Sequence, residues 1–236
     1  MSLFARNAPT PRYTLRQEAY DLIKHALLAG EVKPGRVLSA NAISTELDMS
    51  NSPVREALMD LVGEGLLEVV RNRGFRVHEN SEDDRREIHQ MRSIIEVTAM
   101  QRLAERGLTD AEIVQARRLC AATVEPSPGD TDEAALSDEP LPHTVRYLDA
   151  DQDMHMFLIG LLDNARLTAT VRRLRDQTRV GGALVDMPQS KVSWWSSEHT
   201  ALIDGLVARD VEKVGRVMRR HVDAVHDYIV EEESEG

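Results

Sequence analysis

The sequence predicts a mainly α-helical protein of two domains: an N-terminal helix-turn-helix unit with a β-hairpin wing, and a C-terminal, all-α antiparallel helical bundle. Two observations carry this prediction. Residues 1–79 combine helical spacing with one hairpin pattern, whereas residues 80–236 show helical spacing almost throughout. The charge also changes there: residues 1–80 hold ten basic and ten acidic side chains, and residues 81–236 hold nineteen and thirty. The net charge of −11 therefore belongs to the second domain.

The first domain is expected to contain three helices and a hairpin. Pro34 and Gly35 predict that residues 32–38 form a turn. Ser52 is expected to cap the third helix, with Pro53 in its first position. The two strands meet around the turn at 72–74. The expected elements are helices at 14–29, 40–47 and 52–64, and strands at 66–71 and 75–78.

The second domain is expected to contain six helices. Ser81 with Asp84 and Thr109 with Glu112 form the pairs that begin the first two. Residues 124–142 are acidic, contain four prolines and are expected to form a solvated loop. The buried stripe of the first helix is expected to comprise Ile88, Met91, Ile95 and Leu103. The expected helices lie at about 81–106, 109–122, 143–162, 164–180, 191–208 and 211–232.

Several classes of protein are excluded by what the sequence lacks. No apolar run approaches the length of a membrane span. The first seventeen residues have no apolar core of a secretory signal. The single cysteine, Cys120, excludes an internal disulfide framework and a zinc ribbon. A reducing, cytoplasmic location is therefore expected.

A short helix, a tight turn and a second helix with polar first residues are typical of a helix-turn-helix. The second helix of that motif enters the major groove of DNA with its first residues against the bases. Here those residues are Ser50, Asn51, Ser52 and Arg55. Arg55 could pair with one guanine through two hydrogen bonds, worth about 1–3 kcal/mol of discrimination. The hairpin at 71–76 would form the wing, and its three arginines suit contact with phosphates.

The same pattern allows a second interpretation. A three-helix protein-interaction domain would show similar spacing, with Arg55 paired to Glu56 or Asp60. Local charge decides whether a surface meets phosphates. Residues 1–17 contain three arginines and no acidic residue, which favours the interpretation as a DNA-binding domain.

Three apolar stripes of the second domain contain groups that bind metals. Asp151 and His155 lie four residues apart on one helical face, between leucines. His199 and His221 each interrupt another stripe, eleven residues before and after Asp210. If the last two helices form an antiparallel hairpin, the two imidazoles come level with each other.

A shared cation would satisfy all four of these groups, whereas an unpaired buried carboxylate is costly. Three imidazoles and one carboxylate suit Zn²⁺, Ni²⁺, Co²⁺ or Mn²⁺, and the sequence does not choose among them. The alternative is a hydrogen-bonded Asp151–His155 pair and ordinary buried histidines.

The run MSNSPVREALMDLVGEGLLEVVRNRGFRV at 49–77 resembles the winged helix of the GntR family of bacterial transcription regulators. The helical remainder resembles the FCD domain of the FadR-like subgroup. The resemblance implies a homodimer, a palindromic operator, and a small metabolite that releases or tightens DNA binding. It implies DNA contacts at Asn41, Ser50, Asn51, Ser52, Arg55 and Gly74, to which the basic wing adds Arg73. The chain departs from the common pattern at Asn41 and Asn51, where family members often have arginine, so its operator is expected to differ.

In the helical domain the resemblance implies that Asp151, His155, His199 and His221 are metal ligands. It also matches Arg92, one turn before Glu96, to a position that often faces the effector. The alternative for Arg92 is a salt bridge to Glu96. A carboxylate or sugar acid is the expected effector, since it could fill an open position on the metal.

Three functions compete at this point. The first is a regulator whose metal site senses a metabolite, and the second is the same regulator with a purely structural metal. The third is a metal-dependent hydrolase or isomerase. Against the third, the chain has no HExxH motif, and Glu198 precedes His199 and so points away from the stripe. We therefore expect the protein not to be an enzyme.

Overall fold

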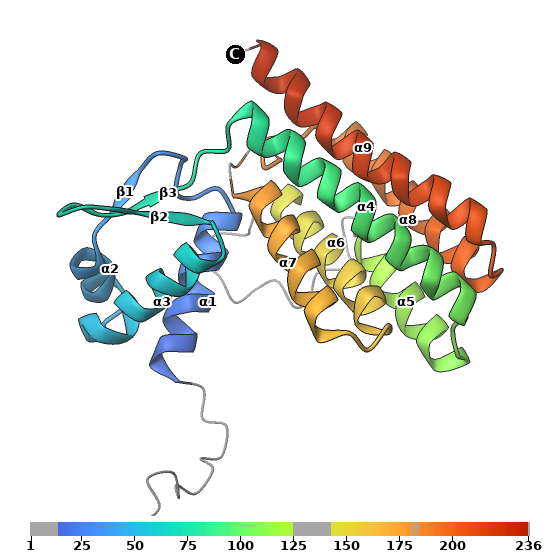
Figure 1. Ribbon diagram of the computed structural model, residues 1–236, viewed down its shortest axis with the longest axis horizontal. Helices are drawn as coiled ribbons and strands as arrows, with labels where there is room; N and C mark the ends of the chain where they lie inside the picture. Colours follow the sequence, from blue (N-terminus) through green and yellow to red (C-terminus); the bar gives the residue numbers. More distant parts are fainter. Residues whose placement is uncertain (1–13, 125–142, 181, 183, 236) are drawn as a thin grey trace, which may run out of the picture. The chain divides into compact units, whose positions relative to one another are not determined.

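The computed structural model describes residues 14–124, 143–180, 182 and 184–235 (Figure 1). The chain divides into two compact units. The first comprises residues 1–27 and 31–78, and the second comprises residues 28–30 and 79–236. Among the described residues, no helix is both long enough and apolar enough to cross a membrane. From residue 125 onward, the expected acidic loop lies outside the described residues.

The first unit is a three-helix domain with a small sheet. Its fully buried apolar residues include Leu58 and Leu61 of α3 and Leu66 and Val77 of the hairpin region. The sheet is antiparallel in the order β1-β3-β2, and Phe75 pairs with both Leu38 and Val69. The elements are α1 (Leu15–Leu28), β1 (Val37–Leu38), α2 (Ala40–Glu46), α3 (Asn51–Gly63), β2 (Leu67–Val70) and β3 (Gly74–Val77).

Two details of this unit differ from the prediction. The segment expected as a turn contains β1, a two-residue strand that pairs with β3. Two residues are too few to show the alternation that reveals a strand. The third helix also begins earlier than expected: Ser50, not Ser52, is its N-cap. Pro53 is then the third helical residue, where its missing N–H costs nothing because that position has no intrahelical partner.

The second unit contains six helices within its described part, in the expected order. Ser81 and Thr109 each form a complete capping box, the latter with Glu112. Asn164 caps its helix by accepting from a backbone N–H, and Asp210 does the same at the start of the last helix. The helices are α4 (Glu82–Arg106), α5 (Asp110–Ala122), α6 (His143–Gly160), α7 (Ala165–Arg179), α8 (Gln189–Val207) and α9 (Val211–Glu235).

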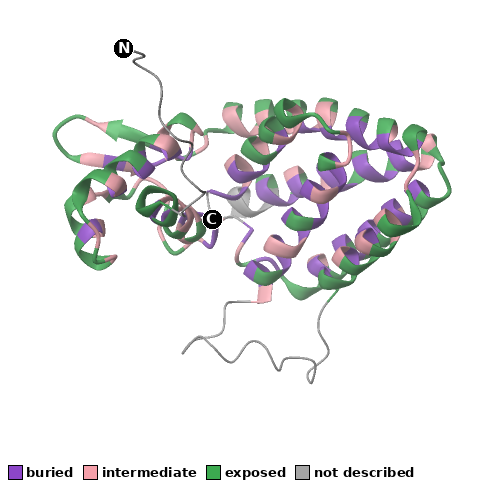
Figure 2. Ribbon diagram, turned by 90° about the horizontal axis from the view of Figure 1, so that it is seen from below, coloured by how far each residue is buried: buried purple, intermediate pink, exposed green. Residues whose placement is uncertain are grey.

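The buried residues lie on the inward faces of these helices (Figure 2). Met100, Leu158 and Leu202 are among those that form the apolar core. The stripe predicted for α4 is right in part: Leu103 is buried in the core and Ile95 packs against it. Met91, however, is 45% exposed, whereas its neighbour Arg92 is buried. The buried face of α4 therefore includes a charged residue, which a search for apolar spacing passes over.

Candidate metal site and nucleic-acid interface

A groove of about 410 Å³ lies between the start of α3 and the wing. Five of the seven predicted DNA-binding residues line it: Asn41, Asn51, Arg55, Arg73 and Gly74. The other two, Ser50 and Ser52, are exposed near the start of α3 but do not line the groove. The helix and the wing thus present their polar groups to one concave surface, as contact with a nucleic acid requires.

The side chain of Arg55 is exposed and, within the described part of the chain, has no hydrogen-bond or ion-pair partner. Asp60 instead accepts two hydrogen bonds from Arg16, at 2.6 and 2.7 Å. Glu56 accepts one from Ser52 at 3.1 Å. The pairing of Arg55 required by the protein-interaction interpretation is therefore wrong, and its guanidinium is available to a ligand.

The two asparagines that replace the family's arginines bond to each other. The side-chain nitrogen of Asn51 donates to the side-chain oxygen of Asn41 at 2.5 Å. This bond leaves donor hydrogens on Asn41 and the side-chain oxygen of Asn51 for other partners. The pair therefore presents both hydrogen-bond donors and acceptors where two positive charges are common in the family.

Gly74 has a structural reason to be glycine. Its φ is +120°, and a Cβ at this position would lie 2.2 Å from the carbonyl oxygen of Leu38 in β1. We expect Gly74→Ala to lower the free energy of unfolding of the first unit by roughly 1–3 kcal/mol, because the wing must move away from β1. Thermal unfolding measures the loss. Gly63→Ala is the matched control, since a Cβ there contacts nothing within 4 Å; equal stability of the two variants would contradict the prediction.

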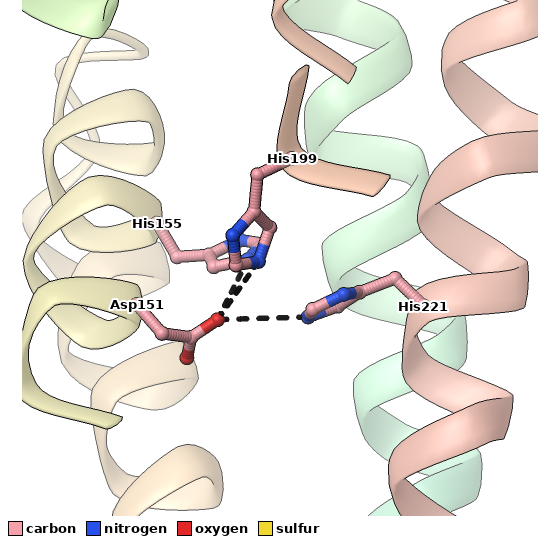
Figure 3. A group of neighbouring side chains, drawn as sticks. All are labelled: Asp151, His155, His199 and His221. Carbon is pink, nitrogen blue, oxygen red and sulfur yellow. Dashed lines mark ion pairs between the residues drawn. The ribbon is translucent and has the colours of Figure 1, made fainter. Parts of the chain in front are cut away.

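The four predicted metal ligands lie together in the second unit (Figure 3). Asp151 and His155 belong to α6, His199 to α8 and His221 to α9. All four are buried, and each offers one ligand atom within 4.8 Å of the others. One carboxylate oxygen, Oδ1 of Asp151, lies 3.0 Å from Nε2 of His199, 3.5 Å from that of His155 and 3.7 Å from that of His221. The last two helices thus form the hairpin that the spacing around Asp210 predicted.

A hydrogen-bond relay fixes the orientation of one imidazole. The hydroxyl of Thr123 donates to the backbone carbonyl of Cys120 at 2.8 Å. Its oxygen also lies 3.0 Å from Nδ1 of His199, so it accepts the Nδ1–H of that ring. In the neutral form of the ring, the lone pair is then on Nε2, the nitrogen that faces the carboxylate of Asp151. Such a contact of two acceptors repels unless a proton or a cation lies between them.

One proton could satisfy only one of the three imidazoles. The ring nitrogens of His155 and Nδ1 of His221 are buried without hydrogen-bond partners among the described residues. A divalent cation would meet all three Nε2 atoms and the oxygen at once, and imidazole with carboxylate is a ligand set of zinc and similar ions. The donor set therefore fits the expected metal.

The charges of the site follow from its burial. Burial alone would raise the pKa of Asp151, but Arg175, His155 and His199 outweigh it and hold the pKa well below its usual range. Burial and the positive charge of Arg175 lower the pKa of His155 well below its usual value. Burial and the neighbouring His199 do the same for His221. Both imidazoles are therefore neutral, as metal ligands must be.

These shifts predict how the stability of the metal-free protein depends on pH. Above pH 6.5, the pKa of these imidazoles in the unfolded chain, protonation does not oppose folding. As the pH falls below that value, stability is lost, because the unfolded chain binds protons that the buried imidazoles do not. As the pH is lowered from 6.5, we expect the free energy of unfolding to decrease by up to about 1.4 kcal/mol per pH unit for each imidazole. Urea unfolding at several pH values measures the slope. The double variant His155→Leu/His221→Leu should lose most of it; an unchanged slope would contradict the assignment.

Sequence reasoning missed Arg175. This buried arginine of α7 donates Nη2 to Oδ2 of Asp151, Nη1 to Glu96 at 2.7 Å and Nε to Gln152 at 3.1 Å. It therefore occupies the second oxygen of the carboxylate and leaves Oδ1 to the imidazoles. A signal did exist: Val171, Arg175 and Arg179 are four residues apart and all buried.

Arg92 forms a salt bridge and also lines a cavity. Its Nε donates to Glu96 at 2.7 Å, which is the salt bridge of the alternative interpretation. Its Nη1 contacts Thr178 at 3.3 Å, and the side chain lines a cavity next to the metal ligands. Glu96 is fully buried and accepts from both Arg92 and Arg175. A chain of ion pairs therefore joins α4, α7 and the ligand carboxylate of α6.

The cavity beside the ligands is small and polar. Its volume is about 20 Å³, enough for about one water molecule. Arg92, Asp151 and His221 line it, together with Tyr147 and Arg179. The Tyr147 hydroxyl and Nε of Arg179 are buried without hydrogen-bond partners in the described part of the chain. Burial raises the pKa of Tyr147, so its hydroxyl remains a donor.

Glu198, the residue that a hydrolase would need as a base, is occupied elsewhere. Its two oxygens accept hydrogen bonds from Arg220 at 2.6 and 2.7 Å. The carboxylate therefore forms a two-bond ion pair with an arginine of α9, which does not favour the hydrolase interpretation.

A winged helix joined to a helical bundle with a buried polar site defines a class: DNA-binding transcription regulators with a ligand-binding domain. A family model described as "FCD domain" matches residues 87–224, and one described as "Bacterial regulatory proteins, gntR family" matches residues 15–77. The chain therefore belongs to the GntR family of bacterial transcription regulators and carries an FCD domain. The resemblance inferred from residues 49–77 and from the helical remainder is confirmed.

Relatives extend over most of the chain. It is 25% identical to the Nta operon transcriptional regulator of Aminobacter aminovorans over 199 residues, which covers 84% of this chain and 87% of that protein. It is 25% identical to the transcriptional repressor GlaR of Escherichia coli over 214 residues, 87% of this chain and 91% of the relative. The solved structure of E. coli McbR/YncC has the same fold, with a TM-score of 0.76 at 20% identity over 93% of this chain and 99% of that one.

Proposed function

We propose that this regulator binds a palindromic operator as a homodimer, and that a small carboxylate or sugar acid controls its affinity for DNA. The effector would bind at a divalent metal ion held by Asp151, His155, His199 and His221. The observation that carries the proposal is the single oxygen of Asp151 that faces three imidazole nitrogens, one of them with its lone pair fixed toward it.

Charge favours an anionic effector. The buried chain of Arg92, Glu96, Arg175 and Asp151 contains two positive and two negative groups and is neutral overall. A divalent cation would add two uncompensated positive charges to a buried site, which is costly unless an anion follows it. The Tyr147 hydroxyl lines the same cavity and has no partner among the described residues, so it could donate to that anion.

The metal would supply a positive charge and open coordination positions, and the protein residues would orient the effector. A ligand larger than one water needs side chains to move, because the cavity is only about 20 Å³. Arg92 and Glu96 are on α4, which is separated from β3 of the wing by only four residues. An effector that draws Arg92 away from Glu96 would bind one arrangement of α4 better than another, which is the condition for shifting a conformational equilibrium.

The test uses DNA fragments selected from a random pool by the protein itself. Fluorescence anisotropy then measures operator affinity with zinc, nickel, cobalt or manganese, and with a set of small carboxylates and sugar acids. We expect Arg55→Ala to weaken binding to the selected operator by about 1–3 kcal/mol, roughly 5- to 150-fold. We expect an effector to change the affinity at least about fivefold, and Arg92→Met to abolish that change while operator binding remains. If no sequence is enriched, the DNA-binding part of the proposal fails.

A second candidate is the same regulator with a purely structural metal, and the small cavity favours it. Asp151→Ala distinguishes the two. If the variant folds but no longer responds to the effector, the metal is sensory. If folding is lost in most of the protein but the remaining folded fraction still responds, the metal serves the fold alone.

A further inference from the structure

The outward face of α9 carries a line of charged residues with an unusual order. Glu212, Arg216, Arg219, Asp223 and Asp227 follow one another at steps of four, three, four and four residues, so they share one face of the helix. Four of them are exposed and Asp223 is half-buried. The line is basic at Arg216 and Arg219 and acidic at Asp223 and Asp227. We call these five residues the α9 seam.

The charges of the α9 seam are poorly compensated within the chain. Arg219 and Asp227 form no hydrogen bond or ion pair in the part of the chain that the structure describes. Arg216 reaches Glu212 only at 3.6 Å, across an exposed pair of side chains. Asp223 accepts from, or pairs with, His89 of α4 at 2.9 Å. The seam thus presents two positive and three negative groups to whatever covers it.

Apolar groups flank the seam. A shallow groove of about 690 Å³ runs along α9 and is lined by Val97 of α4 and Trp194 of α8, besides residues of the seam. Trp194 is 40% exposed. On α4, Ile94 is 65% exposed and lies one turn before Val97, which lines the groove. In Figure 1, α4 and α9 lie side by side along most of their length.

We propose that a second copy of this chain covers this face, with the two α9 helices antiparallel across a two-fold axis near residue 221. In that arrangement Arg219 of one copy faces Asp223 of the other, and Arg216 faces Asp227, each pair occurring twice by symmetry. A parallel arrangement would bring like charges together. The order of charges along the α9 seam therefore favours a second copy of the same helix, and favours it in the antiparallel orientation. This inference rests on the proposed homodimer and names the surface that forms it.

The two kinds of group have different roles at such an interface. Exposed ion pairs are individually weak in water, so the seam fixes orientation and excludes other partners more than it supplies affinity. Burial of Trp194 and Ile94 from both copies would supply most of the affinity, since aromatic anchors dominate interfaces of this kind.

A charge-exchange experiment on the full chain tests the proposal. One variant, Arg216→Glu/Arg219→Glu, makes the seam wholly acidic; the other, Asp223→Lys/Asp227→Lys, makes it basic except at Glu212. Sedimentation equilibrium measures self-association of each variant and of their equimolar mixture. We expect each variant alone to associate at least about tenfold more weakly than the wild type, and the mixture to recover association. Arg166→Glu/Arg172→Glu on exposed positions of α7 is the control, with the same change of net charge.

Circular dichroism shows whether each variant is folded, and Ile94→Glu provides an independent probe from α4 if one seam variant is not. A wild-type dimer that neither seam variant nor Ile94→Glu weakens would overturn this surface and leave the homodimer standing. Weakening by both variants without recovery on mixing would also overturn the antiparallel pairing. A wild-type protein that sediments as a monomer would overturn the homodimer itself.

Discussion

His199→Ala protein is expected to fold but not to retain the transition metal that we expect the wild-type protein to bind. Wild-type protein loaded with zinc and freed of excess should hold about one ion per chain, because one set of four ligands is present among the described residues. Removing one imidazole leaves three ligands and an alanine-sized gap, so affinity should fall by at least about 100-fold. Elemental analysis and competition with a coloured chelator measure both quantities. His221→Ala should behave alike.

The control for this prediction is His89→Ala. His89 is a half-buried histidine of the same unit that pairs with Asp223 and stacks on His226, away from the four ligands. It should keep the wild-type stoichiometry. Retention of one ion per chain by both His199→Ala and His221→Ala would place the metal elsewhere, and absence of metal from reloaded wild-type protein would remove the site altogether.

Arg175→Met is expected to be among the most destabilising single substitutions in the second unit. It leaves the carboxylates of Asp151 and Glu96 buried without the guanidinium that both contact. Breaking a buried ion pair by removing one partner costs roughly 3–5 kcal/mol. Urea unfolding of the metal-free protein measures the loss. Saturating zinc should reduce this loss of unfolding free energy, since a bound cation would balance the charge of Asp151 in place of the missing guanidinium.

Two further variants sharpen this prediction. Arg175→Lys keeps the charge but lacks the planar guanidinium that reaches three partners at once. Its loss of unfolding free energy should therefore be intermediate. Arg172→Met, exposed on the same helix, should change stability by less than about 0.5 kcal/mol. A loss below about 1 kcal/mol in Arg175→Met would show that Asp151 takes up a proton or water instead, and that the ion-pair chain is not a main support of the fold.

The sequence was sufficient to bring the four predicted metal ligands together because each interrupts an apolar stripe. Asp151, His155, His199 and His221 are side chains of types that can bind a metal, and spacing alone placed them on inward faces, where all four are buried. The same reasoning failed for Arg92 and its neighbours on α4, because it counts charged residues as exposed. The buried face of α4 was therefore assigned to Met91, which is 45% exposed.

Other features depend on contacts between distant segments and leave no local pattern. The bond between Thr123 and His199 joins residues 76 positions apart. Strand β1 exists only because β3, more than thirty residues later, pairs with it. Arg175 lies between these cases: its spacing from Val171 and Arg179 indicated burial, but not its two carboxylate partners.

The placement of the four predicted ligands on three helices has a consequence for how fast the protein unfolds. His155 and His199 are 44 residues apart, and His199 and His221 are 22 apart. An ion bound by all of them would act as a removable cross-link that closes two long loops of the chain. Removing the ion with a chelator would then act mainly by shortening the lifetime of the folded state. Without the ion, proteases should reach α6, α8 and α9 sooner, even under conditions where the fold at equilibrium is unchanged.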